Sequence, residues 1–235
     1  MFTLEHEIRY SDYKDFEFVK TSAILEIIQE AAIRDSANCG YSVDDLRKIG
    51  KAWLLQGYNL HLEKPVLTKY PAISAFTAVK KMKGATSERG CIIYQNGEVV
   101  AKSIANWFIF DFEKMRPGRI PQEMSDAYEP HDYNDDFFTF QKPEMLEIET
   151  PEYTVKVSNK DIDTNRHLNN LKGAEILMDA LPFDFEFTDM SVIYKHQAHL
   201  GDVLGVCVKD IENGYYVHLE TKNKDVCVAG TFIKN

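Results

Sequence analysis

A short polar stretch, residues 161–170, holds the side chains with the clearest chemical potential in this 235-residue sequence. It reads Asp-Ile-Asp-Thr-Asn-Arg-His-Leu-Asn-Asn. In an extended segment alternate side chains share a face, so Asp163, Asn165 and His167 would project together. A carboxylate base, an amide and an imidazole are groups that can activate a water molecule beside a polarised carbonyl.

The polar stretch runs directly into a pattern with helical spacing, which predicts a helix near Asn169–Ala180, closed by Pro182. Backbone N–H groups near Asn169–Leu171 would then favour developing negative charge and could supply part of an oxyanion hole. The alternative is that these polar residues decorate a loop and that Asn169 or Asn170 caps the helix. A cap needs only one such residue, and spacing alone does not decide between the two interpretations.

Three motifs together resemble the acyl-acyl-carrier-protein (acyl-ACP) thioesterases of plant plastids and their bacterial relatives. Residues 165–172 are similar to the family signature Asn-x-His-x-Asn-Asn-x-Lys, and Asp163 matches the position two residues before it. Residues 194–198, Tyr-Lys-His-Gln-Ala, resemble a later Tyr-Arg-Arg-Glu-Cys block. Residues 107–121 are similar to the end of the family's first half. The resemblance spans most of the chain.

The chain departs from the family pattern at functionally important positions. Gln197 and Ala198 stand where the family has Glu and Cys, and Gly173 and Ile176 replace a Tyr and a Trp. Because Gln197 cannot ionise, Asp163 is the best candidate base. Asn165 and His167 would orient the thioester and water, and Gln197 could hold water through hydrogen bonds.

The resemblance implies hydrolysis of fatty acyl-ACP thioesters, which releases free fatty acid and terminates fatty acid synthesis, with acyl carrier protein as partner and no cofactor. Three alternatives stay open. The chain could act on acyl-coenzyme A, hydrate an enoyl thioester as a lyase, or bind acyl groups without turnover, since the family's Glu and Cys are missing.

Composition and charge exclude several other functional classes. The formal net charge of -10 argues against nucleic-acid binding and against an anionic membrane surface. We expect no membrane span and no signal peptide. The four cysteines are scattered, as is typical of reduced thiols in a cytoplasmic protein. We expect no metal site, because His196 and His199, three apart in an extended segment, would not share a face.

Helix and strand patterns occur in the same order twice, so we predict an α+β chain with a tandem, or double, hotdog fold. Each repeat would wrap a long helix in a curved antiparallel sheet. The first expected helix begins at Thr21, is capped by Thr21 or Ser22 and is ended by Gly40. Two more helices are expected at Val43–Ile49 and Asn169–Ala180. The expected strands are 2–10, 52–63, 72–82, 88–95, 99–112, 153–158, 190–196, 203–210, 214–222 and 225–233, with a hairpin turn at Asn96-Gly97.

The predicted organisation is an N-terminal hotdog repeat at 1–120, an acidic linker at 121–150 and a C-terminal repeat at 151–235 that carries the catalytic residues. The linker contains nine acidic residues and a single basic residue, Lys142. We expect it to cross the surface. Ser11 precedes Ser22 by as many positions as Ser158 precedes Asn169, which indicates a common register. Pairing of the two repeats would cover sheet edges within one chain. A homodimer is also possible. We expect the first repeat to supply an acyl channel.

Overall fold

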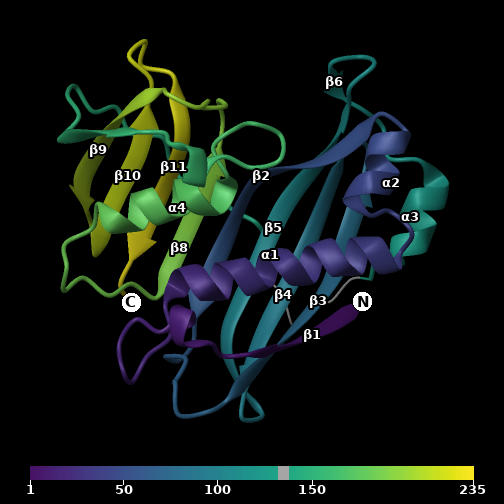
Figure 1. The fold of residues 1–235 in the computed structure, drawn as a ribbon, viewed down its shortest axis with the longest axis horizontal. Coiled ribbons are helices and arrows are strands. Elements are labelled where there is room, and N and C mark those ends of the chain that lie inside the picture. Colours follow the sequence, from purple (N-terminus) through teal and green to yellow (C-terminus); the bar gives the residue numbers. More distant parts are fainter. Residues whose placement is uncertain (132–137) are drawn as a thin grey trace. The chain divides into compact units, whose positions relative to one another are not determined.

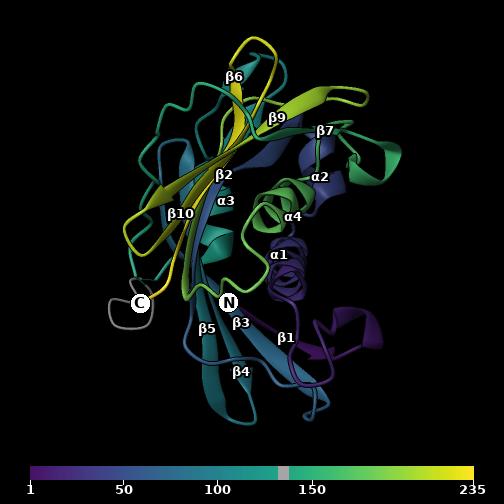
Figure 2. The ribbon, with the colours of Figure 1, turned by 90° about the vertical axis from the view of Figure 1, so that its left-hand side faces the viewer.

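The structure, a computed structural model, describes residues 1–131 and 138–235. The chain divides into two compact units. Unit 1 comprises Met1–Gln56 and Leu60–Phe140, and unit 2 comprises Gly57–Asn59 and Gln141–Asn235. Each unit combines a long helix with an antiparallel sheet (Figure 1). Each long helix lies along one face of its own sheet (Figure 2).

Unit 1 is built around helix α1, which packs against strands β1 and β3. Its sheet has the order β1-β3-β4-β5-β2, and β6 pairs with β5. The helices are α1 (Thr21–Asn38), α2 (Val43–Lys48) and α3 (Gln122–Tyr128). The strands are β1 (Phe2–Glu7), β2 (Lys51–Leu62), β3 (Ala72–Lys83), β4 (Thr86–Gln95), β5 (Glu98–Asp111) and β6 (Arg116–Pro117).

Unit 2 is built around helix α4 (Asn170–Asp179), which packs against β10 and β11. Its sheet has the order β7-β9-β10-β11-β8 when read from β7. The strands are β7 (Tyr153–Lys156), β8 (Asp189–Tyr194), β9 (Val203–Ile211), β10 (Gly214–Glu220) and β11 (Val226–Ile233). None of the helices in the described ranges has the length and apolar character needed to cross a membrane.

The predicted elements are present with small changes at their ends. Asn96 and Gly97 both have positive φ, 51° and 80°, as a two-residue hairpin turn requires, so the predicted turn is confirmed. Strand β1 ends at Glu7 rather than at Tyr10, and β8 ends at Tyr194 rather than at His196. Both strands stop where the chain turns into a loop next to a long helix.

The two units follow the same chain path, element by element. The order β1-β3-β4-β5-β2 matches β7-β9-β10-β11-β8. The Lys20 N–H donates to the Asp12 carbonyl at 2.8 Å, and the Asn169 N–H donates to the Asp161 carbonyl at 2.8 Å. Asp12 and Lys20 therefore correspond to Asp161 and Asn169. The register predicted from Ser11 and Ser158 was wrong by two residues, because shared residue type did not mark the equivalent positions.

The two long helices begin differently. Asn169 caps α4, because its side-chain oxygen accepts the Leu171 N–H at 2.8 Å. The equivalent residue of α1 is Lys20, whose side chain makes no capping bond. The predicted capping of α1 by Thr21 or Ser22 was therefore wrong, since Thr21 and Ser22 already lie in the first helical turn.

The path of the acidic segment 121–150 is set by its apolar residues, which pack on the cores of the two units. Met124 and Tyr128 of α3 are buried in a core cluster of unit 1, so this part does not cross the surface as predicted. Phe138 and Phe140 pack on a second cluster of unit 1, and Met145, Leu146 and Ile148 pack on a cluster of unit 2. The acidic residues Asp132, Asp135 and Asp136 lie outside the described residues.

Replacing Asn169 with alanine should lower the free energy of unfolding by about 1 kcal/mol, because the Leu171 N–H loses its acceptor at the start of α4. Urea denaturation of the full chain measures this change. Asn165→Ala is the control, since Asn165 is exposed and outside the helix. Equal stability of the Asn169→Ala protein and the wild type would contradict the capping role.

Candidate active site

The polar stretch ahead of α4 forms a tight turn. The Asp163 N–H donates to the His167 carbonyl at 2.9 Å, and the Arg166 N–H donates back to the Asp163 carbonyl at 3.0 Å. Arg166 adopts a left-handed conformation with φ of 65°. The prediction that Asp163, Asn165 and His167 project from one face of an extended segment was therefore wrong. The turn instead places Asp163 and His167 opposite each other at its two ends.

The Asp163 carboxylate is fixed by the backbone of its own turn. Its Oδ1 accepts the Asn165 N–H at 2.8 Å and the His167 N–H at 3.3 Å. Its Oδ2 makes no hydrogen bond to the described residues. Asp163 is half-buried, and Asn165 is exposed. One carboxylate oxygen is therefore held in place while the other is left to contact water or substrate.

His167 packs against a second histidine, His199. The two residues form an isolated antiparallel bridge, and their rings lie 4.9 Å apart at 79° in an edge-to-face arrangement. Burial and the neighbouring His199 lower the pKa of His167, while the Asp163 charge opposes this change. The imidazole of His167 is therefore neutral near pH 7 and can both donate and accept a hydrogen bond.

From the sequence we considered His199 only as a metal partner of His196. The contact between His199 and His167 was missed. The His199 N–H donates to Asp202 Oδ2 at 2.7 Å, and the Asp202 N–H donates to the His199 carbonyl at 3.0 Å. These bonds fix the loop that carries His199. No spacing rule could reveal the contact, because it joins two loops from different parts of the chain.

Gln197 lies in the loop that runs beside the turn. The Leu168 N–H donates to the Ala198 carbonyl at 2.8 Å, which brings the backbone next to Gln197 close to His167. The Gln197 side chain is exposed. Within residues 1–131 and 138–235, it makes no hydrogen bond to Asp163 or His167. The structure therefore brings the loops together, and a catalytic role for Gln197 stays a prediction.

The start of α4 offers fewer free donors than we expected. The Asn169 N–H donates to Asp161, and the Leu171 N–H donates to the Asn169 side chain. The Asn170 N–H has no acceptor among the described residues. The Tyr194 hydroxyl donates to the Asn170 carbonyl at 2.8 Å and so helps to fix this residue. Among the donors that we expected at Asn169–Leu171, the Asn170 N–H is therefore the one available to an oxyanion.

The equivalent turn in unit 1 keeps the backbone bond across the turn and has other side chains at the positions of Asp163, Asn165 and His167. The Lys14 N–H donates to the Phe18 carbonyl at 2.8 Å, as Asp163 does to His167. Lys14 and Phe18 therefore take the places of Asp163 and His167, and Phe16 takes the place of Asn165.

The neighbouring loop of unit 1 also corresponds. The Val19 N–H donates to the Val66 carbonyl at 2.9 Å, as Leu168 does to Ala198. Pro65 therefore stands where unit 2 has Gln197. The candidate chemistry is found at the unit 2 positions and not at their unit 1 equivalents.

Solved structures with the same architecture define the fold class. The chain matches an acyl-ACP thioesterase from Bacteroides thetaiotaomicron with a TM-score of 0.87 and 17% identity, over 98% of this chain and 96% of that one. It matches a 12:0-ACP thioesterase from Umbellularia californica with a TM-score of 0.85 and 14% identity, over 99% and 96% of the two chains. The predicted α+β double hotdog is thereby confirmed.

Family models cover both halves of the chain. The acyl-ACP thioesterase N-terminal domain matches residues 1–128, and the acyl-ACP thioesterase C-terminal domain matches residues 144–234. The chain belongs to the acyl-ACP thioesterase family. It is also 22% identical over 207 residues to the chloroplastic oleoyl-acyl carrier protein thioesterase 2 of Arabidopsis thaliana. That match covers 77% of this chain and 55% of the plant protein, so the chain spans about half the length of this relative.

Replacing His199 with glutamine should raise the pKa of His167, because a neighbouring imidazole that disfavours its protonation is removed. An NMR titration of the His167 ring protons measures the shift. If turnover needs neutral His167, the acidic limb of the pH–rate profile should move to higher pH in parallel. His196→Gln is the control for losing an exposed histidine. An unchanged titration of His167 would show that the two rings do not interact.

Proposed function

We propose that this chain hydrolyses the thioester bond of fatty acyl-ACP and releases free fatty acid. The observation that carries the proposal is the turn before α4, which pairs a backbone-held carboxylate with a neutral imidazole. The unit 1 turn has Lys14 and Phe18 at these positions. Membership of the acyl-ACP thioesterase family supports the same reaction.

In the proposed mechanism, Asp163 Oδ2 takes a proton from water as the water oxygen attacks the thioester carbonyl. The bonds from Asn165 N–H and His167 N–H to Oδ1 keep the carboxylate in place during this step. His167 and the Asn165 side chain orient the water and the thioester by hydrogen bonds. Gln197 adds a further hydrogen-bonding group, although it cannot act as a base.

The negative charge that develops on the carbonyl oxygen is stabilised by the Asn170 N–H at the start of α4. Collapse of the tetrahedral intermediate then breaks the carbon–sulfur bond. The proton held by Asp163 is returned to the leaving thiolate, so the products are a fatty acid and a free thiol. No cofactor takes part in this sequence.

Division of labour between the repeats follows from the same comparison. Phe16 and Phe18 cannot take part in acid–base chemistry, whereas the apolar stripe of the helix that follows them, α1, is suited to a hydrocarbon tail. Unit 1 is therefore proposed to supply the acyl channel. Each methylene that such a channel buries contributes about 0.8 kcal/mol, so its depth would select chain length steeply.

The proposed partner is an acyl carrier protein, which is acidic, and the net charge of this chain is also negative. Docking therefore calls for a local basic patch. The candidates are Lys80, Lys81 and Lys83, or Arg116 and Arg119. A cytoplasmic location and a homodimer complete the proposal. Light scattering of the purified chain tests the homodimer.

Thiol release from matched panels of acyl-ACP, acyl-coenzyme A and enoyl thioesters tests the reaction. The wild type should release thiol from saturated acyl-ACP. Asp163→Asn should reduce the rate by about 10²–10⁴-fold, because an amide cannot take a proton from water. The asparagine retains Oδ1 and can still accept the two backbone N–H bonds. Asp15→Asn is the matched control, since the Asp15 carboxylate accepts two N–H bonds in the unit 1 turn.

Each other outcome of this assay points elsewhere. Wild-type rates in a folded Asp163→Asn protein would remove Asp163 as the base. Hydration of the enoyl thioester without thiol release would indicate a lyase. Acyl binding without turnover would indicate a binding module, which the replacement of the family Glu by Gln197 favours. Faster release from coenzyme A than from the carrier protein would reassign the substrate.

A carboxylate introduced at position 197 tests whether that position borders the site. Gln197→Glu should change the shape of the pH–rate profile, because a second titrating carboxylate near Asp163 couples to the first. The kcat/KM profile between acidic and neutral pH is the measurement. His196→Glu, one residue earlier in the same loop, is the control for added charge. Superimposable profiles for Gln197→Glu and the wild type would place Gln197 outside the site.

A further inference from the structure

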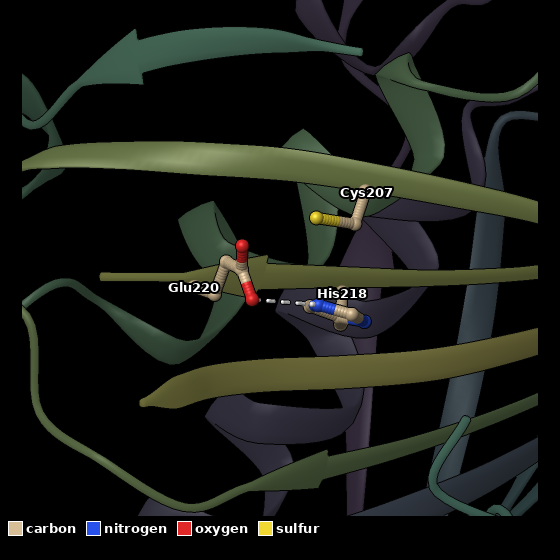
Figure 3. Close-up of side chains that lie close together, drawn as sticks. All are labelled: Cys207, His218 and Glu220. Carbon is tan, nitrogen blue, oxygen red and sulfur yellow. Dashed lines mark hydrogen bonds and ion pairs between the residues drawn. The ribbon is translucent and has the colours of Figure 1, made fainter. Parts of the chain in front are cut away.

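A second group of chemically active side chains lies within the unit 2 sheet, away from the turn. Cys207 on β9 and His218 on β10 are directly opposite each other, and Glu220 follows two residues later on the same face of β10. Cys207, His218 and Glu220 are 0%, 2% and 5% exposed. The sulfur, one ring nitrogen and one carboxylate oxygen all lie within 4.8 Å of one another. Figure 3 shows the three groups facing a common space.

The distance between His218 and Glu220 suits a pair of metal ligands as well as a long hydrogen bond. Nε2 of His218 lies 3.4 Å from Oε2 of Glu220, beyond the usual range of about 2.7–3.2 Å for an N–H···O bond. Two ligands bound tetrahedrally at about 2.0–2.1 Å are separated by about 3.4 Å. His218 Nδ1 has no partner among the described residues, so the ring's polar contact is on the Glu220 side.

The ligand types are those that a borderline-soft cation prefers. Thiolate, imidazole and carboxylate together suit Zn²⁺ or Co²⁺, whereas Mg²⁺ and Ca²⁺ prefer oxygen ligands alone.

Neighbouring residues cover the cluster on one side and leave Oε2 of Glu220 available as a ligand. Lys224 Nζ contacts Oε1 of Glu220 at 2.7 Å, so the other oxygen, Oε2, faces His218. Lys224 also donates to the Glu149 carbonyl at 2.7 Å. The ring of Pro151 packs directly over Gly205, the residue paired with Glu220, where a side chain would not fit. The segment around 149–151 therefore covers the cluster.

We propose that Cys207, His218 and Glu220 bind a divalent transition-metal cation such as Zn²⁺, with a water molecule as the fourth ligand. Binding releases the thiol proton to solvent, and the thiolate and carboxylate charges then balance the cation. The ion fastens β9 to β10 beneath the covering segment. The role is structural, because the cluster is separate from the turn that carries Asp163. This site differs from our expectation of no metal site, because its ligands come from two strands without a metal-binding spacing.

Co²⁺ added to the chelator-treated full chain is the probe, and Zn²⁺ is the competitor. The wild type should bind one equivalent, show a thiolate-to-cobalt charge-transfer band in the near ultraviolet and lose it when Zn²⁺ is added. Cys207→Ser should abolish the band and weaken Zn²⁺ binding about 100-fold or more, because even second-shell changes cost about 10–100-fold. Cys227→Ser is the matched control, since Cys227 is equally buried in β11 and should leave the band unchanged.

Two further readouts keep the test decisive. Zn²⁺ should raise the melting temperature of the wild type and of Cys227→Ser, but not that of Cys207→Ser or His218→Gln. Circular dichroism establishes whether each variant is folded. Absence of the charge-transfer band in the wild type overturns the proposal, whatever the variants do. A band that persists in folded Cys207→Ser also overturns it, and leaves the Glu220–Lys224 ion pair as the role of the cluster.

Discussion

One backbone hydrogen bond in each unit sets the path on which the rest of that unit depends. It joins the Asn169 N–H to the Asp161 carbonyl in unit 2 and the Lys20 N–H to the Asp12 carbonyl in unit 1, at 2.8 Å in both. The bond closes the loop between the first strand and the long helix. A closed loop of fixed length leaves few arrangements for its residues, so residue 163 faces residue 167 just ahead of the helix N-terminus.

Comparison of the two loops separates what the fold needs from what the chemistry needs. Lys14 and Phe18 make the same backbone bond across the turn as Asp163 and His167, so this bond does not require a carboxylate and an imidazole there. In unit 1 the carboxylate that holds the turn is Asp15, one position further along. The carboxylate and imidazole at 163 and 167 are therefore additions to a backbone that forms without them, which favours a functional explanation for their presence.

The sequence predicted most elements because periodicity and turn residues are local. Such signals predict the helix that begins at Asn170, the Asn96-Gly97 hairpin and the order of the strands along the chain. The shape of the polar stretch did not, because the left-handed conformation at Arg166 leaves no mark in residue type. The contact of His167 with His199 was equally invisible, since it depends on which loops the fold brings together. Motifs identified the candidate residues, and only the structure supplied their geometry.

Burial assigns different roles to the two polar clusters of unit 2. Water is a reactant in the proposed thioester hydrolysis, so the proposed base must keep an oxygen within reach of solvent. Asp163 is half-buried, and its Oδ2 makes no hydrogen bond to the described residues. Cys207, His218 and Glu220 lie beneath a covering segment and cannot exchange substrate freely. Burial of such groups is costly unless they are paired or bind an ion. A shared cation would meet that requirement for thiolate, imidazole and carboxylate at once, and it would do so without competing for the chemistry at the turn.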